Sequence, residues 1–299
     1  MNNLTLSKDS APRWLKDAAD IATRSYAQLT APNRPAPDYL ITGTKRGGTT
    51  SLFNYLLMHP GVMGLFPQVR EKKSTDYFFK ELERGDTWYR SHFQTEAYRK
   101  LKGSQLGYRP ISGEASPYYM WDPRIATRIK ASAPQVKSII LLRNPVERAW
   151  SHYQERVQNG VEPLDFVTAL HLEDERMSSE YAAIEDGSEE YSEAFDFYAY
   201  RERGNYLPQL KNWFAKFDLD QVLVMRSEDM YQDVQGAVDQ VCDFLEIPRH
   251  ELPTKRTFNA RKKSTPMPSE ARNYLTNYFA DRNAELFDYL QVEPFWKIG

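Results

Sequence analysis

A glycine-rich loop near the start of this 299-residue sequence has the residue types needed to bind phosphate. Residues 43–51 read GTKRGGTTS and follow a short apolar run. Glycines let backbone N–H groups approach an anion closely, and the first turn of a following helix adds partial positive charge. The hydroxyls at the end of the loop and the side chains of Lys45 and Arg46 would add donors and charge. The loop therefore predicts an anion-binding site, with a short glycine turn that binds nothing as the alternative.

The loop is close to the phosphate-binding loop of nucleoside triphosphatases but lacks its lysine. Its spacing nearly matches G-x4-G-K-[ST], with Thr49 where those enzymes have the lysine that reaches the β and γ phosphates. Magnesium-dependent phosphoryl transfer also uses an acidic residue at the end of a neighbouring strand. The clearest neighbouring strand ends in Arg143, whereas Glu228 and Asp229 follow another one. A nucleotide kinase or triphosphatase is therefore disfavoured and is kept as the alternative function.

A second segment, LLRNPVERAWSHYQ at residues 141–154, also contains phosphate-binding side chains. It sets Arg143 at the end of an apolar run and Ser151 two turns into a helical pattern. A guanidinium binds phosphate with two hydrogen bonds, and a hydroxyl can donate another. Two phosphate sites on two strand–helix units indicate a ligand with phosphates at two ends.

These motifs belong to a pattern of strands that alternate with helices. Apolar runs predict strands at 38–43, 136–145 and 221–229, with a weaker candidate at 113–120. Helical spacing is found at 49–60, 146–157 and 233–245. Such alternation indicates a parallel sheet that is covered on both faces. We therefore expect an α/β fold, a P-loop-like three-layer α/β/α arrangement around a central parallel sheet.

Two segments stand outside this pattern. Pro32, Pro35 and Pro37 separate residues 1–37 from the rest of the chain, and we expect this part to be an N-terminal arm or helix. Residues 38–299 should form one domain, because no later linker divides them. Within that domain, residues from about 165 to 203 are polar and rich in Glu, Ser and Tyr. They predict an insertion or a lid over the site, with a pair of solvated helices as the alternative.

The composition excludes several classes of protein. The net charge of −2 and the pI of about 6.3 disfavour a strongly basic nucleic-acid binder. The one cysteine, Cys242, cannot form an intrachain disulfide and lies in an apolar helical pattern, which favours packing over catalysis. No run reaches the roughly 18 apolar residues of a membrane span, and the N-terminus lacks the features of a signal peptide. We expect a soluble, cytoplasmic protein, and its oligomeric state stays open.

Together the two motifs resemble those of the sulfotransferases that use 3′-phosphoadenosine 5′-phosphosulfate (PAPS). In that family a loop of the type [KR]-x-G-T-[TS] follows the first strand, and L-R-[ND]-P-x-x-R-x-x-S-x-[YF] follows a later one. The segments TKRGGTTSL and LLRNPVERAWSHY match these patterns. The resemblance runs from about residue 38 to Trp296, and it looks closest to the carbohydrate-type, heparan sulfotransferase-like branch and its soluble bacterial members.

This resemblance implies an enzyme that moves the sulfuryl group of PAPS to a hydroxyl or amine of a carbohydrate, lipid or small-molecule acceptor. The reaction would be an in-line displacement that leaves adenosine 3′,5′-bisphosphate (PAP) and needs no metal. The acceptor is then the expected partner, and no nucleic acid is involved. A module that binds PAP without catalysis is a further alternative.

The resemblance also assigns the donor site. The 5′-phosphosulfate would be held by the loop, and the 3′-phosphate by the second motif and by a basic run that closes over it and the adenine. Arg46 stands where the family usually has a lysine that stabilises the leaving phosphate, and the adjacent Lys45 could serve instead. The assigned residues are Lys45, Arg46, Gly47, Gly48, Thr49, Thr50, Ser51, Arg143, Ser151, Arg261, Lys262 and Lys263. For the basic run, a solvated surface is the alternative.

The catalytic base is where the sequence departs from the family. The carbohydrate-type branch has K-E-x-x-[YF]-F, whereas this chain has KSTDYF at residues 73–78, so that Ser74 stands where glutamate is expected. Another group must then accept the proton of the acceptor. The candidates, in order of preference, are Glu71, Asp76, Glu114 and His59. An ordinary surface ion pair with the adjacent lysines is the alternative for Glu71.

Aromatic residues are the candidates for binding the acceptor. Aromatic faces suit sugar rings and apolar small molecules, although most aromatic residues belong to the core. The slight net negative charge argues against a long polyanionic glycan, which favours a basic groove. The residues expected on the acceptor side are Glu114, Tyr118, Tyr119, Trp121 and the Tyr-rich region 181–206, which includes Tyr206.

Overall fold

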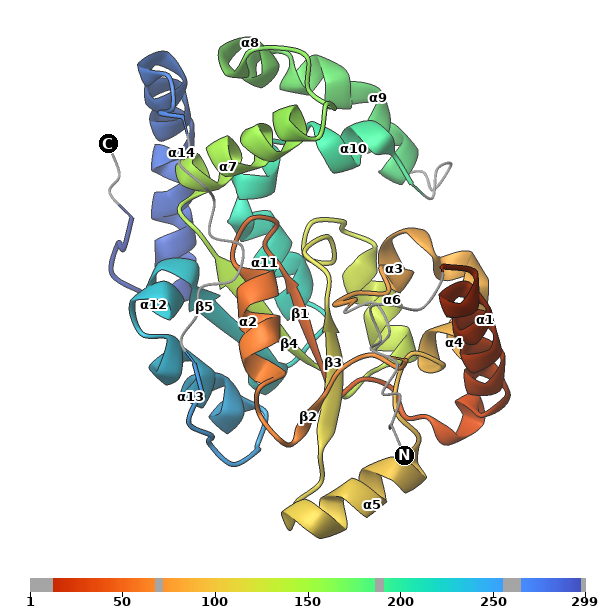
Figure 1. Ribbon diagram of the computed structural model, residues 1–299. Helices are drawn as coiled ribbons and strands as arrows, with labels where there is room; N and C mark the ends of the chain where they lie inside the picture. The colour runs from red at the N-terminus through yellow and green to blue at the C-terminus, as the bar shows by residue number, and fades with distance from the viewer. Residues whose placement is uncertain (1–12, 68–71, 186–190, 255–264, 297–299) are drawn as a thin grey trace, which may run out of the picture.

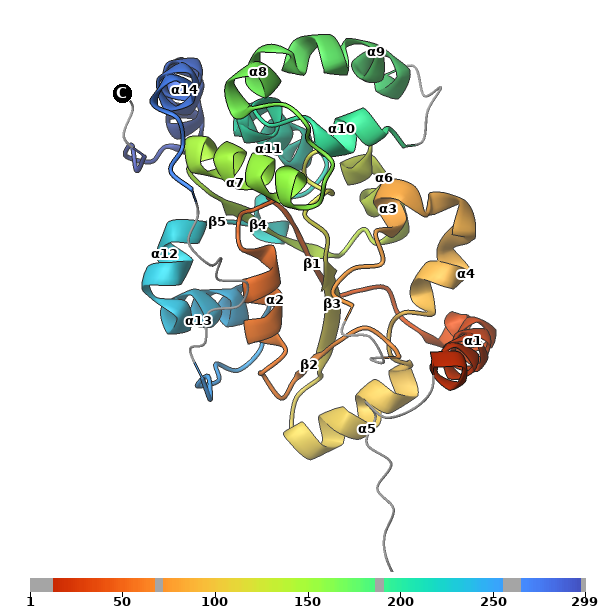
Figure 2. The same ribbon diagram turned by 45° about the horizontal axis from the view of Figure 1, so that its top comes forward.

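A parallel sheet of five strands forms the centre of the part of the chain that the structure describes (Figure 1). The computed structural model describes residues 13–67, 72–185, 191–254 and 265–296. The strands lie in the order β2-β3-β1-β4-β5, and each neighbouring pair is parallel. They are β1 (Tyr39–Gly43), β2 (Val62–Met63), β3 (Ile111–Ala115), β4 (Lys137–Leu142) and β5 (Val222–Arg226). Helices cover both faces, which confirms the predicted three-layer α/β/α fold (Figure 2).

Helices precede, connect and follow these strands. The α-helices are α1 (Arg13–Leu29), α2 (Thr49–Leu56), α3 (Tyr77–Lys80), α4 (Gly85–Arg90), α5 (Glu96–Leu106), α6 (Ile125–Ser132), α7 (Pro145–Gln158), α8 (Phe166–His171), α9 (Glu173–Glu185), α10 (Glu193–Phe197), α11 (Tyr206–Phe214), α12 (Ser227–Gln232), α13 (Val234–Phe244) and α14 (Ser269–Leu290). Short 3-10 helices are η1 (Ala31–Asn33), η3 (Leu82–Arg84), η4 (Glu202–Gly204) and η5 (Leu219–Gln221). Within the described ranges, no helix combines the length and the apolar character that crossing a bilayer requires.

Apolar side chains on both faces of β1 and β4 explain the three layers. Leu40 and Ile140 belong to the core cluster that includes the apolar side chains of α6 and α11. Tyr39, Ile41 and Ile139 belong to the cluster that includes those of α2 and α13. Successive side chains of a strand alternate between its faces, so a strand that is apolar throughout must be covered on both sides.

The central position of β1 creates a crevice at one edge of the sheet. From β1 the chain passes through α2 to β2 and β3 on one side, while β4 and β5 lie on the other side. The connections that leave β1 and β4 therefore diverge at the carboxyl ends of the strands. Ligands of open parallel sheets bind at such a point. The residues that follow β1 and β4 are those of the two predicted phosphate motifs, and the topology brings them to the same edge.

The predicted elements are present with small shifts of their ends. The three predicted strands correspond to β1, β4 and β5, and the three predicted helices to α2, α7 and α13. The weaker candidate at 113–120 is β3, which begins at Ile111. Cys242 is buried in α13, as its apolar pattern predicted. Strand β2 was not predicted, because two residues are too short for a recognisable pattern.

The two segments outside the alternating pattern are helical. The described part of the N-terminal segment forms α1 and η1. The polar segment 165–203 contains α8, α9 and α10, and its Phe166, Met177 and Phe195 are buried. These side chains pack in two different clusters, one with α7 and α14 and the other with Trp121, so they follow no single period along the sequence. A lid function of this segment stays a prediction.

Replacing Gly113 by alanine should destabilise the sheet beneath the crevice. A Cβ at this position would lie 2.2 Å from the backbone oxygen of Tyr39 in the neighbouring strand β1. Because that oxygen cannot move without a shift of the strand, we expect Gly113→Ala to lower the free energy of unfolding by about 3 kcal/mol. Urea denaturation measures this loss.

Gly160→Ala is the control for that substitution. Its added Cβ would meet nothing within 4 Å, and only the positive φ of 71° is unfavourable for alanine. The left-handed conformation costs roughly 1 kcal/mol. A Gly113 variant that is as stable as the Gly160 variant would contradict the predicted clash.

Candidate active site

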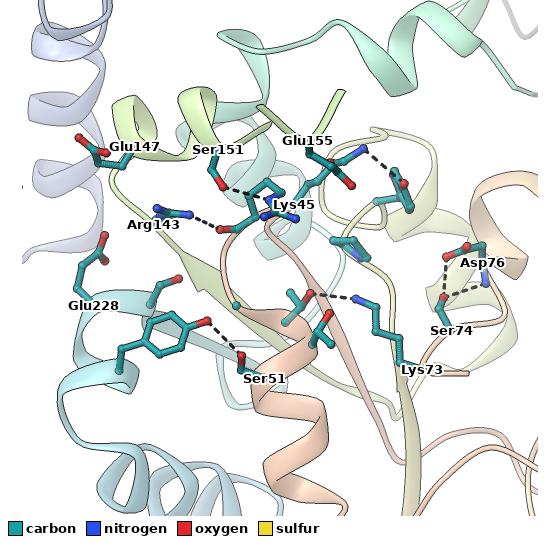
Figure 3. Close-up of a pocket in the computed structure, with 18 residues that line it drawn as sticks. Lys45, Ser51, Lys73, Ser74, Asp76, Arg143, Glu147, Ser151, Glu155 and Glu228 are labelled. Atoms are coloured by element: carbon teal, nitrogen blue, oxygen red, sulfur yellow. Dashed lines mark hydrogen bonds between the residues drawn. The ribbon is translucent and has the colours of Figure 1, made fainter. Parts of the chain in front are cut away.

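A cavity of about 1050 Å³ opens at the carboxyl ends of the strands, between α2, α7, α12 and the segment before α3 (Figure 3). The residues that line it are Lys45, Arg46, Gly48, Thr49, Thr50, Ser51, Lys73, Ser74, Asp76, Pro117, Tyr118, Arg143, Glu147, Ser151, Glu155, Ser227, Glu228 and Tyr231. Both predicted phosphate motifs therefore reach one cavity. Of the predicted donor-site residues that the structure describes, Gly47 is the one that does not line it.

Two glycines shape the first loop. Gly48 precedes α2 with a φ of +92°, a left-handed conformation that other residues rarely adopt. Gly47 packs against β4, where a Cβ would lie 2.7 Å from the backbone oxygen of Leu141. The start of α2, with its backbone N–H groups that have no partner within the helix, therefore opens into the cavity. An anion at this position gains from those groups and from the helix dipole.

The two predicted motifs are in direct contact. The Nε of Arg46 donates to the Oγ of Ser151 at 3.1 Å, and the Nη1 of Arg143 donates to the backbone oxygen of Arg46 at 2.9 Å (Figure 3). The hydroxyl of Tyr206 in turn donates to the backbone oxygen of Arg143 at 2.8 Å. The loop after β1 and the helix after β4 thus form one continuous wall of phosphate-binding groups.

Lys45 is held by the polar segment 165–203. Its Nζ lies 3.4 Å from the Oδ1 of Asp196 in α10 and 3.5 Å from the hydroxyl of Tyr118. The Nη2 of Arg203 lies 3.6 Å from the same carboxylate oxygen. Burial, reinforced by the positive charge of Arg203, lowers the pKa of Lys45 to about 7, while Asp196 opposes the shift. Two buried cations therefore share one carboxylate.

Lys73 reaches the first loop from the side of β3. Its Nζ donates to the Oγ1 of Thr49 at 3.3 Å (Figure 3). Burial lowers the pKa of this lysine to about 8, with Asp76 opposing and Arg46 reinforcing the shift. No role was predicted for Lys73, although it occupies the lysine position of the K-E-x-x-[YF]-F pattern, and that match was the available signal.

Asp76 is the predicted base candidate that lines the cavity. Its Oδ1 accepts hydrogen bonds from the Oγ of Ser74 at 2.6 Å and from the Oγ of Ser116 at 2.8 Å. Glu71, the preferred candidate, lies outside the described residues. His59 follows the opposite end of α2 and does not line the cavity. Among the described candidates, Asp76 is therefore the one whose carboxylate is placed to accept a proton from a molecule in the cavity.

Three predicted acceptor residues, Glu114, Tyr119 and Tyr206, lie behind the cavity wall, and the predicted Trp121 does not line this cavity either. Glu114 is fully buried and accepts from the backbone N–H of Thr75 at 2.6 Å and from the hydroxyl of Tyr119 at 2.8 Å. Burial raises the pKa of Glu114 to about 7. Tyr119 and Tyr206 pack in the core cluster with aromatic side chains of α3 and α4, whereas Tyr118 lines the cavity. The packing therefore supports a structural role for the first three and an acceptor contact for Tyr118.

Acidic residues and a tyrosine that were not predicted complete the lining. Glu147 and Glu155 come from α7, and Glu228 and Tyr231 come from α12. An oxygen of Glu228 accepts from the backbone N–H of Asn144 at the start of α7, at 2.8 Å. This hydrogen bond therefore provides a partner for a backbone N–H group at the N-terminus of α7.

The arrangement can bind a ligand with two anionic ends and accept a proton between them. Four cationic side chains, those of Lys45, Arg46, Lys73 and Arg143, line the cavity, and so do four carboxylates, those of Asp76, Glu147, Glu155 and Glu228. The predicted basic run at Arg261, Lys262 and Lys263 lies outside the described residues. Within the described ranges, no three His, Cys, Asp or Glu side chains are grouped so that they could hold a metal ion.

Comparisons with known proteins identify the family of this chain. Residues 36–273 match the model of the family described as "Sulfotransferase domain". The chain is 26% identical to the membrane-associated sulfotransferase kil1 of Dictyostelium discoideum, over 87% of this chain and 66% of that protein. It is 31% identical to human heparan sulfate glucosamine 3-O-sulfotransferase 6, over 77% of this chain and 58% of that protein. It thus spans two thirds or less of the length of these curated relatives.

A solved structure extends the agreement to the fold. The crystal structure of a sulfotransferase from Alicyclobacillus acidocaldarius superimposes with a TM-score of 0.64 and 27% identity, over 87% of this chain and 97% of that chain. Since the family model covers well over half of the sequence, the chain belongs to the sulfotransferase domain family.

Proposed function

We propose that this sulfotransferase uses PAPS as its donor and a hydroxyl or amine of a carbohydrate, lipid or small molecule as its acceptor. The observation that carries the proposal is the contact between the two phosphate motifs, in which Arg46 bridges Arg143 and Ser151. A cavity with phosphate-binding groups at two ends suits a nucleotide with a 3′-phosphate and a 5′-phosphosulfate. Thr49 stands in place of the triphosphatase lysine, which leaves the kinase alternative with less support.

Two buried lysines of the cavity support an anionic donor. Burial and neighbouring cations lower the pKa of Lys45 to about 7 and that of Lys73 to about 8. A lysine pKa falls when the surroundings stabilise the charged form poorly. A bound ligand with several negative charges would reverse this effect, so the protonated lysines and the donor would stabilise each other.

The transfer step follows from these groups. The acceptor oxygen or nitrogen forms a bond to sulfur while the bond between sulfur and the bridging oxygen of the 5′-phosphate breaks. The electron pair of that bond stays on the phosphate, and Lys73 and Arg46 would stabilise its growing charge. The proton of the acceptor passes to a carboxylate, for which we propose Asp76. Arg143 and Ser151 would hold the 3′-phosphate and so fix the position of the donor relative to Lys73 and Asp76.

A carbohydrate acceptor is supported by relatives and by one aromatic side chain. One curated relative is named as a heparan sulfate sulfotransferase. Tyr118 lines the cavity and stacks on Phe79, with ring centroids 4.7 Å apart and planes inclined by 3°. A flat, fixed aromatic ring of this kind suits the apolar face of a sugar.

Removing the Arg143 guanidinium should abolish recognition of the 3′-phosphate. Calorimetric titration would compare PAP with adenosine 5′-monophosphate, which lacks that phosphate. We expect Arg143→Ala and Ser151→Ala to weaken PAP binding, the arginine variant by about 10- to 100-fold, because hydrogen bonds to charged groups are lost. Binding of the monophosphate should change little in either variant.

Arg226→Ala is the matched control for this experiment. Arg226 occupies the corresponding end of β5, but it pairs with Asp229 and does not line the cavity. Its loss should leave PAP binding unchanged. If Arg143→Ala lowered the affinity for PAP and for the monophosphate equally, the loop would have collapsed. If the protein bound ATP with magnesium but not PAP, the proposed donor would be rejected.

Asp76→Asn should slow transfer without weakening donor binding. Removal of a general base lowers the rate by about 100-fold or more. The rate would be measured with PAPS and an acceptor found by screening unsulfated heparan precursor oligosaccharides and simple phenols. A normal rate in Asp76→Asn with a slow Glu71→Gln variant would assign the base to Glu71.

Binding of PAP should weaken as the pH rises from 8 to 9.5. The pKa of Lys73 is lowered to about 8, so the free protein loses this charge in that interval. We expect a fall in affinity of up to about tenfold per pH unit from one lysine. In Lys73→Arg the guanidinium stays charged, so the fall should be smaller, and the part that remains comes from Lys45, whose pKa is lowered to about 7. An identical fall in both proteins would show that Lys73 does not contact the donor.

A further inference from the structure

The segment 72–76, which carries Lys73 and Asp76, lies directly before α3 and belongs to no helix or strand. Both side chains reach the cavity from this segment (Figure 3). The proposed transfer needs them at fixed positions, because a displacement of about 1 Å in a reacting group can lower a rate about 100-fold. Contacts from outside the segment must therefore hold it in place.

The carboxyl end of β3 provides such contacts. The backbone N–H of Ala115 donates to the backbone oxygen of Lys73 at 2.7 Å. The Oγ of Ser116 donates to the Oδ1 of Asp76 at 2.8 Å. Glu114, the residue before them, holds the part of the segment between Lys73 and Asp76. These three residues of the sheet edge are fully buried, so the segment is attached to the rigid sheet at three points.

The two oxygens of Glu114 bind different parts of the molecule. The Oε2 accepts from the backbone N–H of Thr75 at 2.6 Å. The Oε1 accepts from the hydroxyl of Tyr119 at 2.8 Å and from that of Tyr89 at 3.1 Å. An ionised carboxylate is an acceptor only, and all three of these neighbours can donate. One oxygen therefore holds the segment 72–76, while the other anchors the side chain to the core.

Glu114 cannot itself accept the proton of the acceptor, because it is fully buried and does not line the cavity. Burial raises the pKa of Glu114 to about 7, while hydrogen bonds from Thr75 and Tyr119 oppose the shift and Asp76 reinforces it. A carboxylate in such a place is costly. Strongly perturbed carboxylates are common at functional sites, and the contact of Glu114 with this site is the N–H group of Thr75.

We propose that Glu114 is a positioning residue of the transfer reaction. Its carboxylate holds the N–H group of Thr75 and thereby fixes the carboxylate of the next residue, Asp76, at the cavity. The backbone of Asp76 has a φ of +53°, a left-handed conformation that residues other than glycine adopt infrequently. The contacts from Glu114 and Ser116 maintain this conformation. The inference rests on the proposed function, in which Asp76 accepts the proton.

A double-mutant cycle of Glu114→Gln and Asp76→Asn tests the proposal, with the rate of transfer measured at saturating PAPS. Glutamine fills the same space but offers Thr75 a neutral acceptor, which forms a weaker hydrogen bond. We expect Glu114→Gln to lower the rate about tenfold and to leave the affinity for PAP within about twofold of its original value. In the Asp76→Asn background the same substitution should lower the rate by less than about twofold, because no base remains to be positioned.

Tyr89→Phe is the matched control. It removes a hydrogen bond to the same carboxylate but leaves the bond to Thr75. Its melting temperature should fall, as that of the Glu114 variant does, because each loses hydrogen bonding in the core. Its rate of transfer should stay unchanged. A purely structural role of Glu114 would instead give both variants the same rate.

Amide hydrogen exchange tests the contact without nucleotide or acceptor. Exchange at the N–H group of Thr75, followed by NMR, should be at least about fivefold faster in Glu114→Gln than in Tyr89→Phe. Unchanged protection of this amide in Glu114→Gln would reject the proposal even if no acceptor is found.

Other results separate this proposal from the proposed function. A normal rate in Glu114→Gln beside a slow Asp76→Asn variant would reject the positioning role alone. An equal loss of rate in Tyr89→Phe, or a loss of about tenfold that persists in the Asp76→Asn background, would do the same. A normal rate in Asp76→Asn would reject Asp76 as the base and the positioning role with it, whereas the donor would still be judged by the binding of PAP.

Discussion

The hydrogen bonds that join Arg46 to Arg143 and Ser151 tie two separate strand–helix units into one anion site. Each unit alone offers only a helix start and a few donors. They meet because β1 lies beside β4 in a parallel sheet, so that the segments after both strands emerge at the same edge. The positive φ at Gly48 and the close packing of Gly47 on β4 hold the loop in the shape that this contact needs. The order of the strands is therefore the constraint on which the proposed binding of the donor depends.

The cationic side chains of the site are distributed differently from the family motif that the sequence resembles. Arg46 replaces the usual lysine and is directed to Ser151 on α7. Lys45, the expected substitute, is held by Asp196 of α10. The ammonium group beside the hydroxyls of the loop is instead that of Lys73, which comes from the segment before α3. When the loop itself contains arginine, another part of the chain can thus supply the ammonium group of a lysine.

Helix α10 connects the polar segment 165–203 to the candidate active site. Its Asp196 compensates the buried charges of Lys45 and Arg203, and its Phe195 stacks on Trp121. Adjacent residues of the helix therefore contact buried cations and an aromatic side chain. Displacement of α10 would leave two buried cations without their carboxylate, which is costly in a medium of low dielectric constant.

The sequence by itself determined the three-layer fold, the two phosphate motifs and the family, because apolar runs, glycine turns and motif spacing are local patterns. Only the tertiary structure decided which of these residues meet. Arg46 and Ser151 are 105 residues apart in sequence, and Lys45 and Asp196 are 151 apart. The tertiary structure also decided that Glu114 and Tyr119 face the core, since the helices that cover them are not adjacent in sequence. Burial and pairing of side chains depend on such distant contacts, which no local pattern of residues specifies.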